Sequence, residues 1–258
     1  MAVSRSAFAV LPVAGLLLAA GPLAAQAPRT IAFESDDSLP ITADLYTPLP
    51  PASPFIVLFH QAGASRGEYR EIAPRLVAMG FNCMAVDQRS GEEANGVVNE
   101  TAKRADAEKR PVSMLAARQD VEASLRYARE HFAKGQLLAW GSSYSAALVL
   151  VVAGQRKGLV DGVLAFSPGE YFPVSPGGPQ MVTDAARAIT VPVFITAARS
   201  ESDWRPIFAV IAPGLRRSYV PEAEGRHGSS ALWKRTPGQE GYWQAVRGFL
   251  NLRFPRSK

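Results

Sequence analysis

Cysteine is nearly absent from the chain, which has a single one, Cys83, among 258 residues. An internal disulfide is therefore impossible, and the hydrophobic core must stabilise the folded state. Cys83 lies in an apolar run at residues 81–86, which predicts a buried packing residue rather than a reactive thiol. Histidines are also few, three in all, so the sequence predicts no zinc site, no other metal and no cofactor.

Long basic runs are lacking as well, although positive charge is in slight excess. The chain has 28 Lys and Arg against 23 Asp and Glu, a formal net charge of +5. The basic residues fall in scattered pairs such as Arg216-Arg217, whereas nucleic-acid binding requires a concentrated basic patch. We therefore expect no nucleic-acid partner. No feature of the sequence indicates an oligomeric state.

A long hydrophobic stretch occurs at the amino terminus, where residues 7–25 are mostly apolar. Arg5 precedes this stretch and Ala25-Gln26-Ala27 ends it, which is the pattern of a secretory signal peptide. Its Pro and Gly residues disfavour a permanent membrane span, and the alternatives are an uncleaved anchor or cleavage at Ala25. We expect residues 1–27 to be a cleavable leader and residues 28–258 a single domain. The mature protein would then be exported, periplasmic or secreted, with no stable membrane span.

Apolar runs of strand length recur along the rest of the chain. The first two, at residues 30–33 and 41–46, predict an opening hairpin. From residue 55 on, such runs alternate with helical patterns, which indicates a parallel sheet with helices on both faces. The later strands are expected at residues 55–59, 81–86, 137–140, 160–166, 192–197 and 218–220, and helices at residues 69–79, 112–131 and 243–252.

Two connecting stretches lack such patterns. Residues 92–111 are polar and charged, which predicts a mobile loop bordering the functional site. Residues 167–179 are rich in Pro and Gly, which predicts a second loop, too short and irregular to form a large cap domain. Tyr171 and Phe172 in this second loop would lie above the carboxyl edge of the sheet, where open α/β sheets bind their ligands.

The central pattern is an apolar strand at residues 137–140, a turn of small residues, and a helix that begins at once. Ser143 stands in this turn with Gly141 two residues before it and Ser145 two residues after it. Small residues at both positions let a strand and a helix pass each other around a strained serine. Ordinary helix capping by a serine-rich turn is the alternative interpretation. A register centred on Ser145 is also open, but only Ser143 puts a glycine at the end of the strand.

This turn resembles the nucleophile elbow of the α/β-hydrolases, with serine in place of the second glycine of the G-x-S-x-G pattern. The resemblance implies a carboxylate and then a histidine later in the chain. Glu201 follows the strand at residues 192–197 at the expected spacing, and Asp203 is the alternative. His227, followed by a glycine in the loop after the last strand, matches the catalytic histidine.

The oxyanion-binding groups follow from the same resemblance. The turn at residues 60–65 comes after a buried strand, where α/β-hydrolases offer a backbone N–H to the oxyanion. Gln61 replaces the first glycine of that loop, so we assign the donor to Ala62, with Gln61 as the alternative, and pair it with the N–H of Tyr144. His60 is expected to be structural, as are the Asp and Arg of the loop at residues 87–91. Gln61, Tyr171 and Trp204 are candidates for the substrate pocket.

The resemblance covers nearly all of the mature chain and fits best the uncapped serine esterase and dienelactone-hydrolase-like branch of the superfamily. It implies an α/β-hydrolase fold with a mostly parallel eight-stranded sheet, no large cap domain, and hydrolysis of a small-molecule ester or lactone through an acyl-enzyme. Dienelactone hydrolases themselves use a cysteine nucleophile, where this chain has Ser143. Two other functions remain open: a peptidase of the prolyl-oligopeptidase kind, and a non-catalytic binding protein on a hydrolase scaffold.

Overall fold

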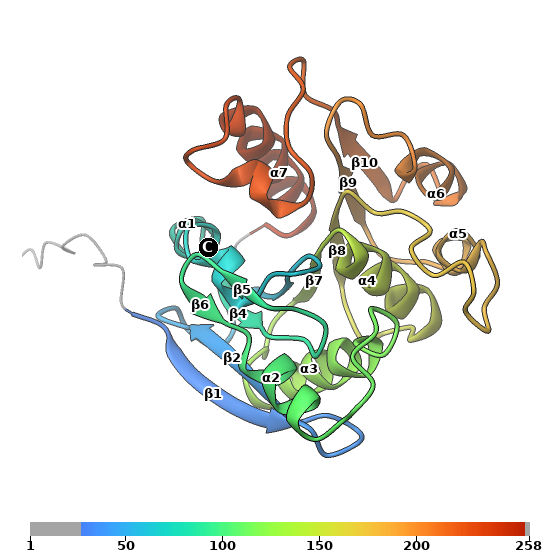
Figure 1. The fold of residues 1–258 in the computed structure, drawn as a ribbon. Coiled ribbons are helices and arrows are strands. Elements are labelled where there is room, and N and C mark those ends of the chain that lie inside the picture. The colour runs from blue at the N-terminus through green and yellow to red at the C-terminus, as the bar shows by residue number, and fades with distance from the viewer. Residues whose placement is uncertain (1–26, 256–258) are drawn as a thin grey trace, which may run out of the picture.

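An eight-stranded sheet forms the centre of the molecule (Figure 1). The structure is a computed structural model that describes residues 27–255. The spatial order of the strands is β1-β2-β4-β3-β7-β8-β9-β10. Within this sheet, only the pairs of β2 with β1 and with β4 are antiparallel. The strands span β1 Arg29–Glu34, β2 Pro40–Tyr46, β3 Phe55–Phe59, β4 Asn82–Val86, β7 Leu137–Ser142, β8 Gly162–Phe166, β9 Val193–Thr196 and β10 Arg216–Tyr219.

Alternate residues of each central strand face two separate hydrophobic clusters. In β3, Phe55, Val57 and Phe59 belong to one cluster, and Ile56 and Leu58 belong to the other. A strand buried on both faces needs an unbroken apolar sequence, which explains the continuous runs of the later strands. Each cluster is completed by helices that cover one face of the sheet.

The helices divide between the two faces. One face carries α1 (Ile72–Ala78) and α7 (Gln239–Arg253) with the short 3-10 helices η1 (Arg66–Tyr69) and η2 (Ser229–Leu232). The other carries α3 (Arg118–His131), α4 (Tyr144–Gln155), α5 (Met181–Arg187) and α6 (Trp204–Val210). The predicted fold class, a mostly parallel eight-stranded sheet with helices on both faces, is therefore confirmed.

The prediction of a mobile loop at residues 92–111 is wrong. This segment contains a hairpin of β5 (Glu93–Ala94) and β6 (Val97–Val98), followed by helix α2 (Glu100–Ala107). Asn95 and Gly96, both with positive φ, make the two-residue turn that such hairpins favour. The side chain of Asn99 caps α2 by accepting a hydrogen bond from the N–H of Ala102 at 2.8 Å.

The connection between β8 and α5 is a loop, as predicted, and residues 27–255 include no cap domain over the sheet. In the part of the chain that the structure describes, no helix has the length and hydropathy of a membrane span. The predicted leader lies outside the described residues, apart from its last residue. Cys83 is fully buried in β4, which confirms its expected packing role.

Candidate active site

Ser143 occupies the turn between β7 and α4 in a conformation that non-glycine residues rarely adopt, with φ 59° and ψ −123°. Its N–H is held by the carbonyl of Phe166 at 2.7 Å, so the neighbouring strand fixes the turn. A Cβ on Gly141 would overlap the carbonyl oxygen of Ser145. The turn is therefore tight enough to require the glycine that the sequence places there.

Ser145 takes the place of the second glycine because its hydroxyl has buried partners. Its Oγ donates to the carbonyl of His60 at 2.5 Å and accepts from Nε2 of Gln88 at 2.5 Å. Ser145 is fully buried, whereas Ser143 retains 8% exposure at the apex of the turn. Of the two serines, Ser143 is therefore the one that combines a strained backbone with access to solvent.

His227 and Glu201 are brought together from two loops at the same edge of the sheet. Nδ1 of His227 contacts Oε1 of Glu201. The other oxygen of Glu201 accepts from Oγ of Ser167 at 2.6 Å and from the N–H of Ala198 at 2.9 Å. Burial acts to raise the pKa of Glu201, but the hydrogen bonds, first that of His227, outweigh it and hold the pKa below its usual value. Glu201 is thus an ionised partner for the imidazole.

Asp203, the alternative acid, is exposed and makes no contact with His227. It precedes α6 at the cap position, but its side chain accepts no capping hydrogen bond. Of the two carboxylates after β9, the structure brings only Glu201 to the histidine.

The loop that carries His227 is fastened to the serine turn. The N–H of Ser229 donates to Oγ of Ser142 at 2.8 Å, and the N–H of Gly228 donates to Oγ of Ser167 at 2.9 Å. Gly228 has φ 67°, and a Cβ there would lie 2.5 Å from Oγ of Ser142. These contacts hold the imidazole of His227, whose side chain is 45% exposed, near the turn of Ser143.

Tyr171 lies beside Ser143. Its hydroxyl donates to the carbonyl of Ser167 at 2.8 Å, and burial raises its pKa while the nearby Ser143 opposes that rise. Among the described residues no hydrogen bond joins Ser143 to His227. Trp204, the third candidate for the pocket, is only 5% exposed and donates from its indole N–H to the carbonyl of Glu201 at 3.1 Å. Trp204 therefore supports the loop of Glu201 from within the core.

The loop after β3 carries both candidate oxyanion donors. The N–H of Gln61 is taken by Oε2 of Glu68 at 2.8 Å. Within residues 27–255, neither the N–H of Ala62 nor that of Tyr144 has an acceptor. The side-chain oxygen of Gln61 is buried without a hydrogen-bond partner, close to Gly228.

His60 supports this loop through contacts with the backbone. It is fully buried, and burial lowers its pKa to about 4, so the imidazole is neutral. Its Nδ1 lies 2.8 Å from the carbonyl of Gln61, and its Nε2 accepts from the N–H of Gln88 at 3.1 Å. These backbone contacts confirm the structural role expected of His60.

Glu68 is a residue of the site that the sequence analysis misses. It is fully buried, and its two carboxyl oxygens accept from the N–H of Gln61 and from Oγ of Ser142, both at 2.8 Å. Its backbone carbonyl accepts from the indole N–H of Trp233 at 2.8 Å. Burial raises the pKa of Glu68 to about 7. One carboxyl group thus connects the loop after β3 to the serine turn, and nothing in its local sequence distinguishes it from a solvated helix residue.

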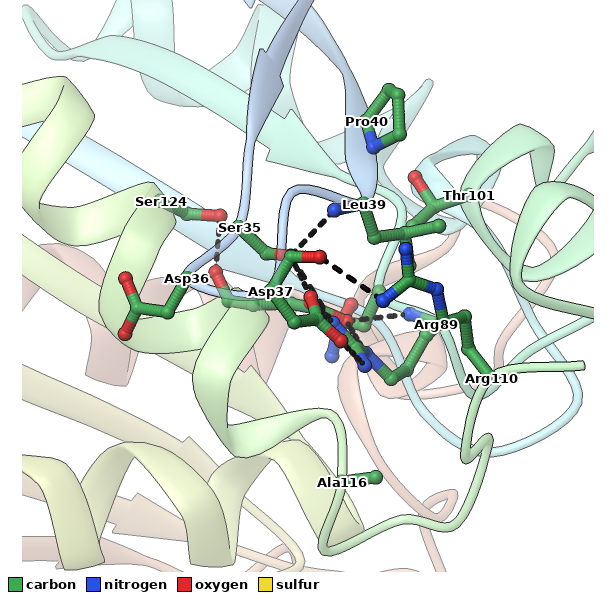
Figure 2. Close-up of polar contacts among 12 residues, drawn as sticks. Ser35, Asp36, Asp37, Leu39, Pro40, Arg89, Thr101, Arg110, Ala116 and Ser124 are labelled. Atoms are coloured by element: carbon green, nitrogen blue, oxygen red, sulfur yellow. Dashed lines mark hydrogen bonds and ion pairs between the residues drawn. The ribbon is translucent and has the colours of Figure 1, made fainter. Parts of the chain in front are cut away.

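Arg89, in the loop after β4, joins three segments behind the site (Figure 2). Its guanidinium donates to Asp37 at 2.8 Å, to Ser35 at 3.2 Å and to Asp120 at 2.8 Å. The hydrogen bond from Arg89 is the main reason that the pKa of Asp37 lies well below its usual range. The connection between β1 and β2 is thereby tied to the start of α3, which agrees with the structural role expected of this arginine.

The strand order and the serine turn between β7 and α4 define an α/β-hydrolase. The model of the Dienelactone hydrolase family matches residues 41–204, and the chain belongs to that family. This membership identifies it as an enzyme of the carboxylesterase class, which hydrolyses ester bonds. The matched range includes Ser143 and Glu201 and ends before His227.

Solved structures with the same fold include three hydrolases. Est1E from Butyrivibrio proteoclasticus, solved with ferulic acid, has 14% sequence identity and a TM-score of 0.67, covering 88% of this chain and 100% of that chain. Dienelactone hydrolase from Anabaena variabilis has 12% identity and a TM-score of 0.66, covering 88% and 99%. An esterase from Pyrococcus furiosus has 14% identity and a TM-score of 0.61, covering 88% and 91%. None of the curated proteins compared with the chain matches it.

Proposed function

We propose that this enzyme is a serine esterase that hydrolyses small-molecule carboxylic esters or lactones through an acyl-enzyme. Ser143 is the nucleophile, His227 the general base and acid, and Glu201 the carboxylate that orients the imidazole. The contact of His227 with Glu201, in a loop hydrogen-bonded to the strained serine turn, is the observation that carries the proposal.

The reaction begins when Oγ of Ser143 attacks the ester carbonyl carbon and Nε2 of His227 takes the hydroxyl proton. The N–H groups of Ala62 and Tyr144 receive the oxyanion of the tetrahedral intermediate. The imidazolium passes its proton to the leaving alkoxide, which departs as the alcohol. Water then attacks the acyl-enzyme, His227 accepts a proton from it, and the carboxylic acid leaves as the proton returns to Ser143. Glu201 stabilises the charged imidazolium throughout.

Tyr171 lies close enough to Ser143 for the serine to oppose the rise in the pKa of the tyrosine. This nearness supports a place for Tyr171 in the substrate pocket. For catalysis the hydroxyl of Ser143 has to point toward His227, because proton transfer requires hydrogen-bond contact with the base.

The test is covalent labelling with a fluorophosphonate, peptide mapping, and hydrolysis of p-nitrophenyl acetate by the wild type and two serine variants. Ser143→Ala is expected to lose labelling and to lower kcat by a factor on the order of 10⁶. Ser145→Ala removes only buried hydrogen bonds and is expected to keep the labelling. Labelling at any other serine, or unchanged turnover by Ser143→Ala, would contradict the proposal. Cleavage of a blocked dipeptide amide as fast as the ester would indicate a peptidase instead.

We also propose that the protein is exported to the periplasm or secreted after removal of residues 1–27. The basic start, apolar middle and Ala-x-Ala end of this stretch support the proposal. Expression of the full chain and amino-terminal sequencing of the product, with separation of cell compartments, tests it. An intact amino terminus in the cytoplasmic fraction would contradict export, and an intact one in the membrane fraction would indicate an anchor.

A further inference from the structure

A cavity of about 510 Å³ lies against the loop that carries Ala62. Its wall is built by the loop after β4, by β6 and α2, and by the segment that follows α2. Its lining includes Ala62, Arg89, Ser90, Val98, Ala102 and Met114, with Val112 at the rim. A volume of this size falls in the range of small-molecule sites. We call it the α2 cavity.

The α2 cavity is connected to the serine turn through two contacts. Ala62, whose N–H is assigned to the oxyanion, lines the cavity and is exposed. Ser90 lines it too, and its carbonyl accepts a hydrogen bond from the hydroxyl of Tyr144 at 3.0 Å. Tyr144 follows Ser143 directly. A substrate whose carbonyl oxygen lies at Ala62 therefore has one of its substituents next to this cavity.

Exposed apolar side chains gather at the rim of the α2 cavity. In the described part of the chain six large hydrophobic residues are exposed, and three of them line this cavity: Val98 at 47%, Val112 at 44% and Met114 at 38%. Hydrophobic side chains left exposed together around a hollow indicate a surface that a ligand covers. The chemistry of the rim suits an apolar group.

The charged groups of the α2 cavity do not favour an anion. Arg89 lines it, but its guanidinium is held by Asp37 and Asp120. The remaining charged lining residues are one cation, Lys103, and two carboxylates, Glu92 and Asp106. An anionic substituent would meet one attractive and two repulsive charges.

From these observations we infer that the α2 cavity binds a neutral, apolar substituent of the ester substrate. The inference rests on the proposed esterase function. The substituent can belong to the acyl or the alcohol part of the ester, since both flank the carbonyl group. The β5–β6 hairpin and α2 thus form a specificity element of this chain.

Ala102→Phe tests the inference by filling the cavity from α2, where the half-buried Ala102 lies. Two series of neutral esters separate the two parts of the substrate: p-nitrophenyl acetate, butyrate and hexanoate, and ethyl, butyl and hexyl acetate. In the series whose chain enters the cavity, we expect Ala102→Phe to lower kcat/KM of the six-carbon member about tenfold, chiefly through KM. Its activity on ethyl acetate, whose acyl and alcohol parts are both too short to fill the cavity, should stay within about threefold of wild type, which also shows that the variant folds. An equal effect on short and long members of both series would overturn the inference.

A second variant removes apolar surface without filling the space. Met114→Ser is expected to weaken selectivity for the long ester severalfold, and Leu252→Ser, which removes a 63% exposed side chain outside the cavity, is the matched control. The neutrality of the group is tested by comparing p-nitrophenyl hexanoate with the mono-p-nitrophenyl ester of adipic acid, which ends the same chain in a carboxylate. Preference for the anionic ester by the wild type would overturn the inference.

Binding without turnover separates this inference from the proposed function. Saturation-transfer NMR of methyl hexanoate with Ser143→Ala is expected to show contact with the alkyl chain, and the double variant with Ala102→Phe is expected to lose it. Binding that Ala102→Phe abolishes, in a wild type without ester turnover, would keep the cavity and reject the esterase. Turnover of short esters with no binding of the chain at Ala102 would keep the esterase and reject the cavity.

Discussion

Two carboxylates, two residues apart, follow β9. We expect one of them to be essential for turnover and the other to be dispensable. Glu201 contacts His227 and Asp203 does not, so Glu201→Gln removes the group that orients and stabilises the imidazolium. We expect Glu201→Gln to lower kcat by a factor on the order of 10⁴, with little change in KM, because the lost interaction acts in the transition state. Asp203→Asn is the matched control and should stay within about twofold of wild type. Steady-state kinetics with p-nitrophenyl acetate distinguishes the two, and a reversed order would make Asp203 the acid.

Glu68 predicts a pH dependence of stability with a definite sign. Burial raises its pKa from 4.5 to about 7, so the folded protein holds this proton more tightly than the unfolded chain between these pH values. Its contribution to stability is complete below pH 4.5 and is lost as the pH rises through 7. The free energy of unfolding of Glu68→Gln minus that of wild type should therefore increase by about 3 kcal/mol between pH 4.5 and pH 8.

Urea unfolding followed by tryptophan fluorescence at several pH values measures this difference. Taking the difference between the two proteins cancels the other titrating groups, including His60, whose lowered pKa acts in the opposite direction. A pH-independent offset between Glu68→Gln and wild type would mean that Glu68 is ionised in the folded protein throughout the range. The size of any constant offset reports the two hydrogen bonds that Glu68 accepts.

Some residues of the site could be proposed from the sequence, whereas others could not. Ser143, Glu201 and His227 each stand beside a recognisable strand end, so their positions could be inferred from a pattern. Glu68 could not be found in this way, because its partner Ser142 is 74 residues away in the sequence and only the fold brings Glu68 between Ser142 and the N–H of Gln61. Trp204 was a candidate for the pocket, and the structure adds that its indole N–H donates to the carbonyl of Glu201.

The turn between β7 and α4 is the element on which the site depends, and glycine at its start is a packing requirement. Gly141→Ala would place a methyl group onto the carbonyl of Ser145. We expect the free energy of unfolding to fall by roughly 2–4 kcal/mol and ester turnover to fall with it, because Ser143 is displaced. Gly248→Ala in α7 is the control, since nothing lies within 4 Å of the added methyl group and the helix should gain about 0.5–1 kcal/mol. Thermal unfolding measures the stability of both variants. If Gly141→Ala were as stable as Gly248→Ala, the turn would not require a glycine.

The elements themselves were largely predictable, and the failures share a physical cause. Strands buried on both faces need continuous apolar runs, and such runs located β3, β4, β7, β8 and β9. The edge strand β10 is largely polar and partly exposed, and it begins two residues before the predicted run at 218–220. The β5–β6 hairpin was missed because its strands are two residues long and mostly exposed, so burial leaves no alternating pattern. Helix α2 was missed because it is strongly charged and buries only Thr101 and Ala105. Only local signals in the sequence mark these two elements: the Asn95-Gly96 turn for the hairpin and the Asn99 cap for α2.

For the molecule as a whole, the ion network of Arg89 is expected to matter more than any surface ion pair. Arg89 and Asp120 have fully buried side chains, and Arg89→Met would leave the carboxylate of Asp120 without its partner. We expect a loss of roughly 3–5 kcal/mol in the free energy of unfolding. Arg126→Met, which breaks the exposed pair with Asp36, is the matched control and should change it by less than about 1 kcal/mol. Urea unfolding of both variants at pH 7 measures the difference, and similar losses would contradict the prediction.

The single thiol of Cys83 allows the opening of the sheet to be measured by the rate of its chemical labelling. Cys83 lies in β4 between Tyr46 of β2 and Ile56 of β3, and its side chain is fully buried. A thiol reagent therefore reaches it only after the strands on either side have separated, and one sulfur per chain gives one uncomplicated labelling curve. At low reagent concentration the labelling rate reports how often the sheet is open, and at high concentration it approaches the rate of opening itself. The lifetime of the folded enzyme can thus be measured without denaturant, from the labelling of one sulfur atom.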